Sequence, residues 1–170
     1  MDNKALYKLT HGLYVVGVKN GEGFGGCIVD AVAQVSAGNT PNIIVSSMLK
    51  NFTNELIKKE QKFTLSILGK NVDPFVIANF GFQSARTVDK WKNIPHSLVE
   101  GLPVANDAVS YLRLKVTNTT ELETHSMFLC DIVDAWVGEN ASDPLVYEDY
   151  QKDMKSLTMD AFNKFKEGQK

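Results

Sequence analysis

The sequence predicts a mainly β protein, a small closed or Greek-key barrel with short helices and a C-terminal helix. Strand patterns dominate the first two thirds of the chain, where about six or seven β-rich segments alternate with glycine-rich turns. Only two short helical patterns interrupt them. Beyond Tyr150 the apolar spacing changes to that of one amphipathic helix. We therefore expect a barrel domain over residues 1–150 and a C-terminal helix or tail over 151–170.

The composition is that of a globular protein without a nucleic-acid partner. The 170 residues are 44% hydrophobic and 22% charged, which is enough to build one buried core. The net charge is −2, from 18 basic and 20 acidic residues that are mixed along the chain. No basic stripe is available to release counterions from DNA or RNA.

Neither a membrane span nor a metal site is expected. The apolar run that begins at Leu13 ends at Lys19, well short of the roughly 18 residues needed to cross a bilayer. Cys27 and Cys130 lie in predicted strands, and neither has a Cys or His at metal-ligand spacing. We expect both to be reduced core residues of a cytoplasmic protein.

The first elements are predicted to form a hairpin and a third strand. Gly12 to Lys19 is rich in β-branched and aromatic residues, and Asn20-Gly21 follows as a hairpin turn with positive φ at both positions. The returning strand runs from about Phe24 to Val35. After a turn at Pro41, Asn42 to Met48 forms the next strand.

Two short helices and three further strands complete the barrel. Thr53 is predicted to cap a helix over Asn54 to Glu60, and Asp73 a second helix ending at Phe80. The strands are Lys62 to Leu68, Tyr111 to Thr117 and His125 to Val137. Residues 81–107 are expected to be irregular.

The C-terminal helix has an apolar stripe at helical spacing and ends near Gly168. The stripe consists of Met154, Leu157, Ala161, Phe162 and Phe165. We expect it to pack on the barrel or on a partner subunit.

The segment from Ser46 to Thr53 joins a strand end to a helix start. It places the hydroxyls of Ser46 and Ser47, the amide of Asn51 and the ammonium of Lys50 near the free amides of that helix. This is a possible phosphate site. The alternative is that Thr53 only caps the helix while Lys50 is solvated, and spacing alone favours that alternative.

A second polar segment, Phe80 to Trp91, carries Ser84, Arg86 and Lys90 among aromatic residues. Arginine and lysine here could bind the same phosphate. Taken alone, the segment is better explained as a surface loop in which Asp89 offsets the positive charges.

Together the segments resemble a known family, the flavin reductase-like FMN-binding split barrels, which include flavoredoxins and rubredoxin-linked flavoproteins. The matching blocks are Gly26 to Ser36, Lys50 to Ile57, Phe80 to Arg86 with Val88 to Trp91, and Thr124-His125. They follow the family's order over about residues 5–150, and this colinearity overrides the solvated reading of Lys50.

The resemblance implies an FMN-binding split β-barrel and a homodimer with flavins near its interface. The residues implied to line the isoalloxazine and ribityl chain are Asp30, Ala31, Val32, Gln34, Ser46 and Ser47. Those implied to hold the phosphate are Lys50, Asn51, Thr53, Ser84 and Arg86, with Lys90 supporting their loop. His125 is implied to face the open side of the flavin, where nicotinamide or another substrate docks.

The sequence departs from the family's usual pattern at several positions, of which Asp30, in place of the common Asn, matters most. A carboxylate close to the flavin would disfavour the anionic reduced form and lower its potential.

The function expected from the resemblance is hydride transfer from NADH or NADPH to FMN, and onward to free flavin, a rubredoxin-like carrier or oxygen. The alternative is an FMN-binding electron-transfer module without a nicotinamide site of its own. A third reading keeps the barrel but exchanges FMN for haem or pyridoxal phosphate.

Overall fold

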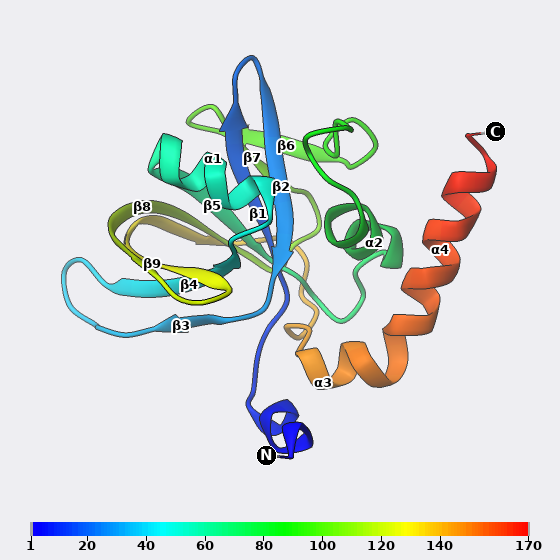
Figure 1. Cartoon of the computed structure of the whole chain (residues 1–170), viewed down its shortest axis with the longest axis horizontal. Helices are drawn as coiled ribbons and strands as arrows, with labels where there is room; N and C mark the ends of the chain where they lie inside the picture. The colour runs from blue at the N-terminus through cyan, green and yellow to red at the C-terminus, as the bar shows by residue number, and fades with distance from the viewer. Residues whose placement is uncertain (1, 170) are drawn as a thin grey trace.

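A seven-stranded antiparallel sheet, curled into a split half-barrel, forms the centre of the protein (Figure 1). The computed structural model describes residues 2–169. The strand order in the sheet is β2-β1-β5-β8-β9-β4-β3. Its strands are β1 (Tyr14–Asn20), β2 (Gly23–Val29), β3 (Val32–Gln34), β4 (Asn42–Met48), β5 (Lys62–Ile67), β8 (Ser110–Glu121) and β9 (His125–Val137). The mainly β architecture is confirmed.

The first hairpin forms one residue later than predicted. Asn20 is the last residue of β1 and pairs with Gly23, so Gly21 and Glu22 make the turn. Of these two only Gly21 has a positive φ, 58°. A glycine at the first turn position is typical of a type II′ turn, so the prediction that Asn20 shares the positive-φ turn is wrong.

The long returning strand predicted over Phe24 to Val35 is two strands. β2 pairs with β1 at one edge of the sheet, whereas β3 pairs with β4 at the other. The chain bends at Asp30, whose carbonyl accepts from the amide of Val32 at 3.0 Å. This crossing between edges depends on the tertiary arrangement, which no local sequence signal specifies.

Helix α1 (Phe52–Glu60) begins before the predicted cap. Its N-cap residue is Asn51, which makes no side-chain capping bond. Thr53 lies inside the first turn and is buried, so the prediction that it caps the helix is wrong. For α2 (Pro74–Phe82) the predicted cap is confirmed, because Asp73 Oδ1 accepts from the amide of Phe75 at 2.8 Å.

The stretch predicted to be irregular contains a second, two-stranded sheet, β6 (His96–Val99) and β7 (Leu102–Ala105). It covers part of the outer face of the main sheet, where Thr64 Oγ1 donates to the carbonyl of Pro103 at 2.5 Å. This close approach needs Gly17, because a Cβ there would lie 2.1 Å from the same carbonyl oxygen.

Two apolar clusters make up most of the core. One fills the barrel and includes Phe63, Leu65, Leu114, Phe128 and Cys130. The other lies between the sheet and α2 and includes Leu13, Ile77, Phe80, Trp91 and Leu145. Cys27 and Cys130 are both free and buried, as predicted.

The C-terminal helix is confirmed and packs on α2, although Leu157 of the predicted apolar stripe is 53% exposed and does not take part. A short helix α3 (Tyr147–Asp149) and a π-helical turn (Tyr150–Met154) lead into α4 (Lys155–Glu167), with Gly168 at its end. Phe162 lies edge-on to Phe82 at 5.4 Å between ring centroids, and Phe165 lies 4.8 Å from Phe75. In Figure 1, α4 runs along the outside of the domain beside α2. The division of the chain into a barrel domain over 1–150 and a C-terminal helix or tail over 151–170 stays a prediction. Residues 1 and 170 lie outside the described range.

Among the helices over residues 2–169, none combines the length and apolar character needed to cross a membrane. A 3-10 turn at Asn3–Lys8 precedes β1.

Candidate functional site

A polar cavity of about 210 Å³ lies at the N-terminal end of α1, between β2 and the loop that follows α2. It brings together predicted site residues from both polar segments, namely Lys50, Asn51, Thr53, Ser84 and Lys90. The rest of its wall is Cys27, Ile28, Phe52, Phe80, Gly81, Gln83 and Ala85. Two segments that are more than 30 residues apart in the sequence, 50–53 and 84–90, thus face one space.

The most buried cation of the cavity is Lys90, which is only 3% exposed. Its Nζ donates to the carbonyl of Gly26 at 2.9 Å and to the carbonyl of Phe80 at 2.8 Å. Burial lowers the pKa of Lys90 to about 8, and its interaction with Cys27 opposes this shift. An ammonium has three N–H donors, so one is left for a ligand in the cavity.

The backbone that carries Lys90 is held by buried groups on either side. Asn79 Nδ2 donates to the carbonyl of Lys90 at 2.7 Å, and Gln83 Nε2 donates to Asn79 Oδ1 at 2.7 Å. Trp91 Nε1 donates to the carbonyl of Gly25 at 2.9 Å. Asn79 was not identified from the sequence, where an asparagine within an apolar helix gives no functional signal.

Helix α1 supplies the other side of the cavity. The first amides of a helix have no partner within it, and its N-terminal end carries a partial positive charge. Lys50 is exposed at the mouth, and the hydroxyl of Thr53 faces Cys27 inside. Burial raises the pKa of the Cys27 thiol, while the hydroxyls of Thr53 and Ser47 and the charge of Lys90 oppose the rise. At pH 7 the thiol is therefore protonated, and it contributes no charge to the cavity wall.

Asn54 joins this helix to the strands beside it. Its Nδ2 donates to the carbonyl of Ser47 at 3.0 Å, and its Oδ1 accepts from Ser126 Oγ at 3.2 Å. The Oγ of Ser47 is buried and has no hydrogen-bond partner among residues 2–169, although it lies close enough to Cys27 to affect the pKa of that thiol. Sequence reasoning missed Asn54, which the structure identifies as the link between α1, β4 and β9.

Arg86 lies outside the cavity. Its guanidinium forms an ion pair with Glu55 and stacks over the ring of Phe52, with 4.4 Å to the ring centroid. Arg86 instead borders a neighbouring shallow hollow with Phe24. In this arrangement it supports Phe52, which does line the cavity.

The residues implied to line the isoalloxazine form a second group around β3 and β4. The amide of Ser46 donates to the carbonyl of Ala31 at 2.9 Å, and Val32 pairs with Val45. The side chain of Gln34 turns away to the carbonyl of Ser36 at 2.9 Å. None of Asp30, Ala31, Val32, Gln34, Ser46 and Ser47 lines the 210 Å³ cavity. The group is joined to it by the short connection from Ser47 to Lys50.

His125 lies beside this connection. It opposes Met48 in the pairing of β4 with β9, and the amide of Leu49 donates to the carbonyl of Thr124 at 3.0 Å. Its Nδ1 is 2.8 Å from Thr124 Oγ1. The imidazole therefore stands at the end of β4 that leads into the cavity.

The donor set of the cavity fits a phosphate ester. Two ammonium groups, the hydroxyls of Thr53 and Ser84, and the α1 amides are all suited to a dianion. The volume is below the roughly 300 Å³ of common ligand pockets, so the cavity accommodates the phosphate end of FMN but not its ring. No group of three or more His, Cys, Asp or Glu side chains within residues 2–169 could hold a metal ion.

Comparisons with known proteins identify the family of the chain. Residues 6–156 match the family described as "Flavin reductase like domain". The chain is 37% identical over 163 residues to the high molecular weight rubredoxin of Moorella thermoacetica, covering 93% of this chain and 69% of that protein. It is 29% identical over 160 residues to the ferric-chelate reductase (NAD(P)H) of Archaeoglobus fulgidus, and the match covers 93% of this chain and 94% of that protein.

A solved structure shares the fold. The FMN-binding protein from Thermus thermophilus with bound p-hydroxybenzaldehyde superposes with a TM-score of 0.74 at 26% identity, over 82% of each chain. The split-barrel prediction is thereby confirmed.

Proposed function

We propose that this chain, which belongs to the flavin reductase-like domain family, binds FMN and uses NADH or NADPH to reduce it. The observation that carries the proposal is the cavity at the start of α1, where Lys50 and Lys90 converge with hydroxyl and amide donors. Bound there, FMN would supply the hydride-accepting chemistry that the chain's own side chains lack. The task of the chain is to hold and orient it.

The phosphate is assigned to Lys50, Asn51, Thr53 and Ser84, with Lys90 at the back of the cavity. Each charge-assisted hydrogen bond to a phosphate oxygen contributes about 1.5–3 kcal/mol, more than the 0.3–1 kcal/mol or so of the helix dipole. The two lysines therefore dominate the affinity. Arg86 acts at the rim, through Phe52, as long as it remains paired with Glu55.

The ring is assigned to the group around β3 and β4. The ring-lining residues proposed are Asp30, Ala31, Val32, Gln34, Ser46 and Ser47. Backbone amides of this segment would stabilise negative charge that develops on reduction. The carboxylate of Asp30 would act in the opposite direction and lower the reduction potential.

His125 is assigned to the open side of the ring. Its position opposite Met48 places it at the strand end next to the cavity. There it can donate a hydrogen bond to the carboxamide of the incoming nicotinamide or to another substrate. Its role is to position the substrate.

A homodimer is proposed to complete the site. Apolar side chains are exposed beside His125, with Met48 at 36% and Leu122 at 53%. Apolar residues gathered at one end of a domain often mark an interface. A second copy would cover this end and shield the ring from water. The electron acceptor is free flavin, a rubredoxin-like carrier or oxygen.

The test is anaerobic mixing of the FMN-loaded protein with NADH and with NADPH, followed by flavin absorbance. Loss of the flavin absorbance with at least one of the two supports the reductase. If neither bleaches the protein but reduced rubredoxin does, the chain is an electron-transfer module without a nicotinamide site. A protein whose spectrum is that of haem or pyridoxal phosphate would contradict FMN.

A further inference from the structure

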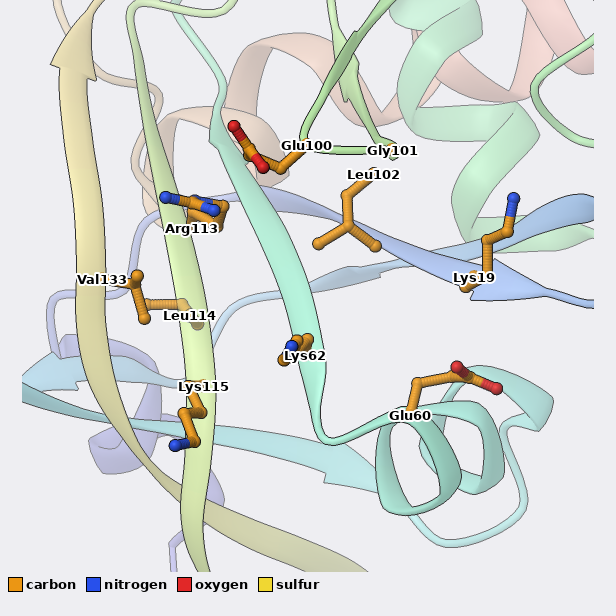
Figure 2. A pocket seen from close by; sticks show the side chains of 10 residues that line it. All are labelled: Lys19, Glu60, Lys62, Glu100, Gly101, Leu102, Arg113, Leu114, Lys115 and Val133. Atoms are coloured by element: carbon orange, nitrogen blue, oxygen red, sulfur yellow. The ribbon is translucent and has the colours of Figure 1, made fainter.

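A second cavity, of about 510 Å³, lies on the outer face of the sheet and shares no wall residue with the flavin phosphate cavity. We call it the outer groove. Figure 2 shows the side chains that line it, which come from the ends of β1 and α1, from β5, β8 and β9, and from the β6–β7 turn. They are Lys19, Glu60, Lys62, Glu100, Gly101, Leu102, Arg113, Leu114, Lys115 and Val133.

The sheet register explains why the cations gather here. Lys62 on β5 pairs directly with Lys115 on β8, and Arg113 pairs with Thr64. Because side chains alternate along a strand, Lys115 and Arg113 lie on the same outer face. β7 covers that face at Thr64, whose hydroxyl donates to the carbonyl of Pro103, and the groove is the part that β7 leaves open.

The pairing of Lys62 with Lys115 is unfavourable for the fold, since like charges directly opposite each other in a sheet destabilise it. Within residues 2–169 neither lysine has a carboxylate partner, and Lys19 has only the ring of Phe24 beneath it, at 4.9 Å. On the other side of β8, Asp131 lies opposite Lys115 without forming an ion pair with it, so the repulsion is only partly offset in the free protein. A bound anion would relieve it.

Arg113 adds a buried donor without a partner. Its Nε is buried and unbonded among the described residues, and its only ion pair is a long one, 3.9 Å, to Asp134. Of the two acids in the wall, Glu60 is paired with Lys59 at 3.4 Å. That leaves Glu100, at the rim beside Arg113 in Figure 2, as the one unpaired acid of the wall. The wall therefore carries four cations and two carboxylates, while Asp131 and Asp134 lie opposite Lys115 and Arg113 on β9.

The groove also has an apolar part, because Leu102 and Val133 lie in its wall. In Figure 2 the side chain of Leu102 projects between Arg113 and Lys19. The volume is within the roughly 300–1,000 Å³ typical of small-molecule sites. A ligand that matches both parts carries two or more negative charges on an apolar or planar body.

We propose that the outer groove binds an organic phosphate, with Lys62, Lys115 and Arg113 on the phosphate groups and the body of the ligand against Leu102 and Val133. The site is independent of the flavin assignment, since the two cavities lie at opposite ends of α1. The volume of about 510 Å³ favours a small molecule over the acidic surface of another protein.

The test is calorimetric titration of ADP, with inorganic pyrophosphate and adenosine alongside, into protein saturated with FMN at low salt. If the protein takes up no FMN, the titration is made on the protein as purified, so failure of the flavin proposal does not affect this one. ADP is expected to bind to one site, more tightly than pyrophosphate or adenosine. The affinity is expected to fall by about tenfold or more in the double variant Lys62→Ala Lys115→Ala.

Two controls separate the groove from a general loss of charge. The double variant Lys92→Ala Lys164→Ala removes the same charge from other surfaces and is expected to bind ADP as the parent does. Lys62→Arg Lys115→Arg keeps the charges and is expected to keep the affinity within about threefold.

The proposal is overturned if ADP shows no saturable binding at millimolar concentration, or binds equally well to the Lys62→Ala Lys115→Ala protein. It is also overturned if a poly-glutamate peptide binds in a Lys62- and Lys115-dependent way while ADP does not. That result would make the groove a docking surface for an acidic protein.

Discussion

The ammonium of Lys90 donates a hydrogen bond to the carbonyl oxygen of Gly26 over 2.9 Å, which ties the loop after α2 to strand β2. The same ammonium bonds the last turns of α2 through the carbonyl of Phe80. A buried lysine that binds two carbonyls is both a structural clamp and the innermost charge of the phosphate cavity. Its protonation therefore connects stability with binding.

The pKa of Lys90 predicts a pH-dependent stability. Its folded pKa is about 8, below the ordinary 10.5. Below pH 8 both states carry the proton, and the cost of burying the charge is fully present. Between pH 8 and 10.5 the unfolded chain keeps the proton and the folded protein loses it, so stability rises with pH by up to about 3 kcal/mol.

The measurement is urea unfolding of the parent and of Lys90→Met across this range. The free-energy difference between them is expected to shift in favour of the parent as the pH rises from 8 to 10.5. The Cys130 thiol, whose pKa is raised to about 12 by burial, gives an opposite slope above pH 9, but it is present in both proteins and cancels. A difference that does not change with pH would contradict the assignment.

Substitution of Gly26 by a residue with a side chain is predicted to destabilise the protein. A Cβ there would lie 2.6 Å from the carbonyl oxygen of Val16 and 2.9 Å from the ring of Phe80. Gly26→Ala is expected to lower the free energy of unfolding by about 1–3 kcal/mol, because the backbone must shift to accept the methyl group. Gly23→Ala in the same strand is the control, since its Cβ would meet nothing closer than 3.8 Å. Equal effects of the two substitutions would exclude the steric explanation.

Asn54 is predicted to hold α1 against β4 and β9. Asn54→Ala leaves the carbonyl of Ser47 and the hydroxyl of Ser126 without this partner. The expected loss is about 1–3 kcal/mol in the free energy of unfolding, since an unpaired buried polar group costs about that much. Asn118, which is exposed on β8, provides the matched control. The role assigned to Asn54 fails if Asn118→Ala is equally harmful in the same denaturation experiment.

The contact of α4 with α2 is predicted to depend on two phenylalanines. Phe162→Ala Phe165→Ala removes the contacts with Phe82 and Phe75 and is expected to destabilise the domain by several kcal/mol, or to release α4 while the barrel stays folded. Hydrogen exchange distinguishes these results residue by residue. Leu157→Ala Met159→Ala on the exposed face is the control and should change little. Unchanged protection of α4 in the phenylalanine variant would count against this packing.

The sequence predicted best the elements whose faces are unequally buried. β4 and β9 have the bounds that their alternation indicates, because one face of each packs in the barrel. β6 and β7 escaped prediction since they are only four residues long and Pro103 interrupts the strand pattern. The break at Asp30 has no local signal, because only the closed sheet requires the chain to change edges there.

Local sequence patterns predicted the residues of the site less well than they predicted the strands and helices. The spacing of Ser46 to Thr53 favoured a capped helix, yet Thr53 turned out to face Cys27 in the cavity. From the residues alone, a phosphate shared by Lys50 and Lys90 was the less favoured explanation, and the family resemblance made it the preferred one. The chain brings these two lysines together from segments far apart. Asn54 and Asn79 could not be found, because a buried amide that holds other groups looks like any polar residue in a helix.

The most direct test of the phosphate site is titration of apo-protein with FMN and with riboflavin, for the parent and for Lys50→Ala, with Lys164→Ala as the charge-matched control. The parent is expected to prefer FMN, and Lys50→Ala is expected to weaken FMN binding by one to two decades, about 1.5–3 kcal/mol, with riboflavin binding unchanged. Equal affinity of the parent for FMN and riboflavin, or unaltered FMN affinity in Lys50→Ala, would contradict it.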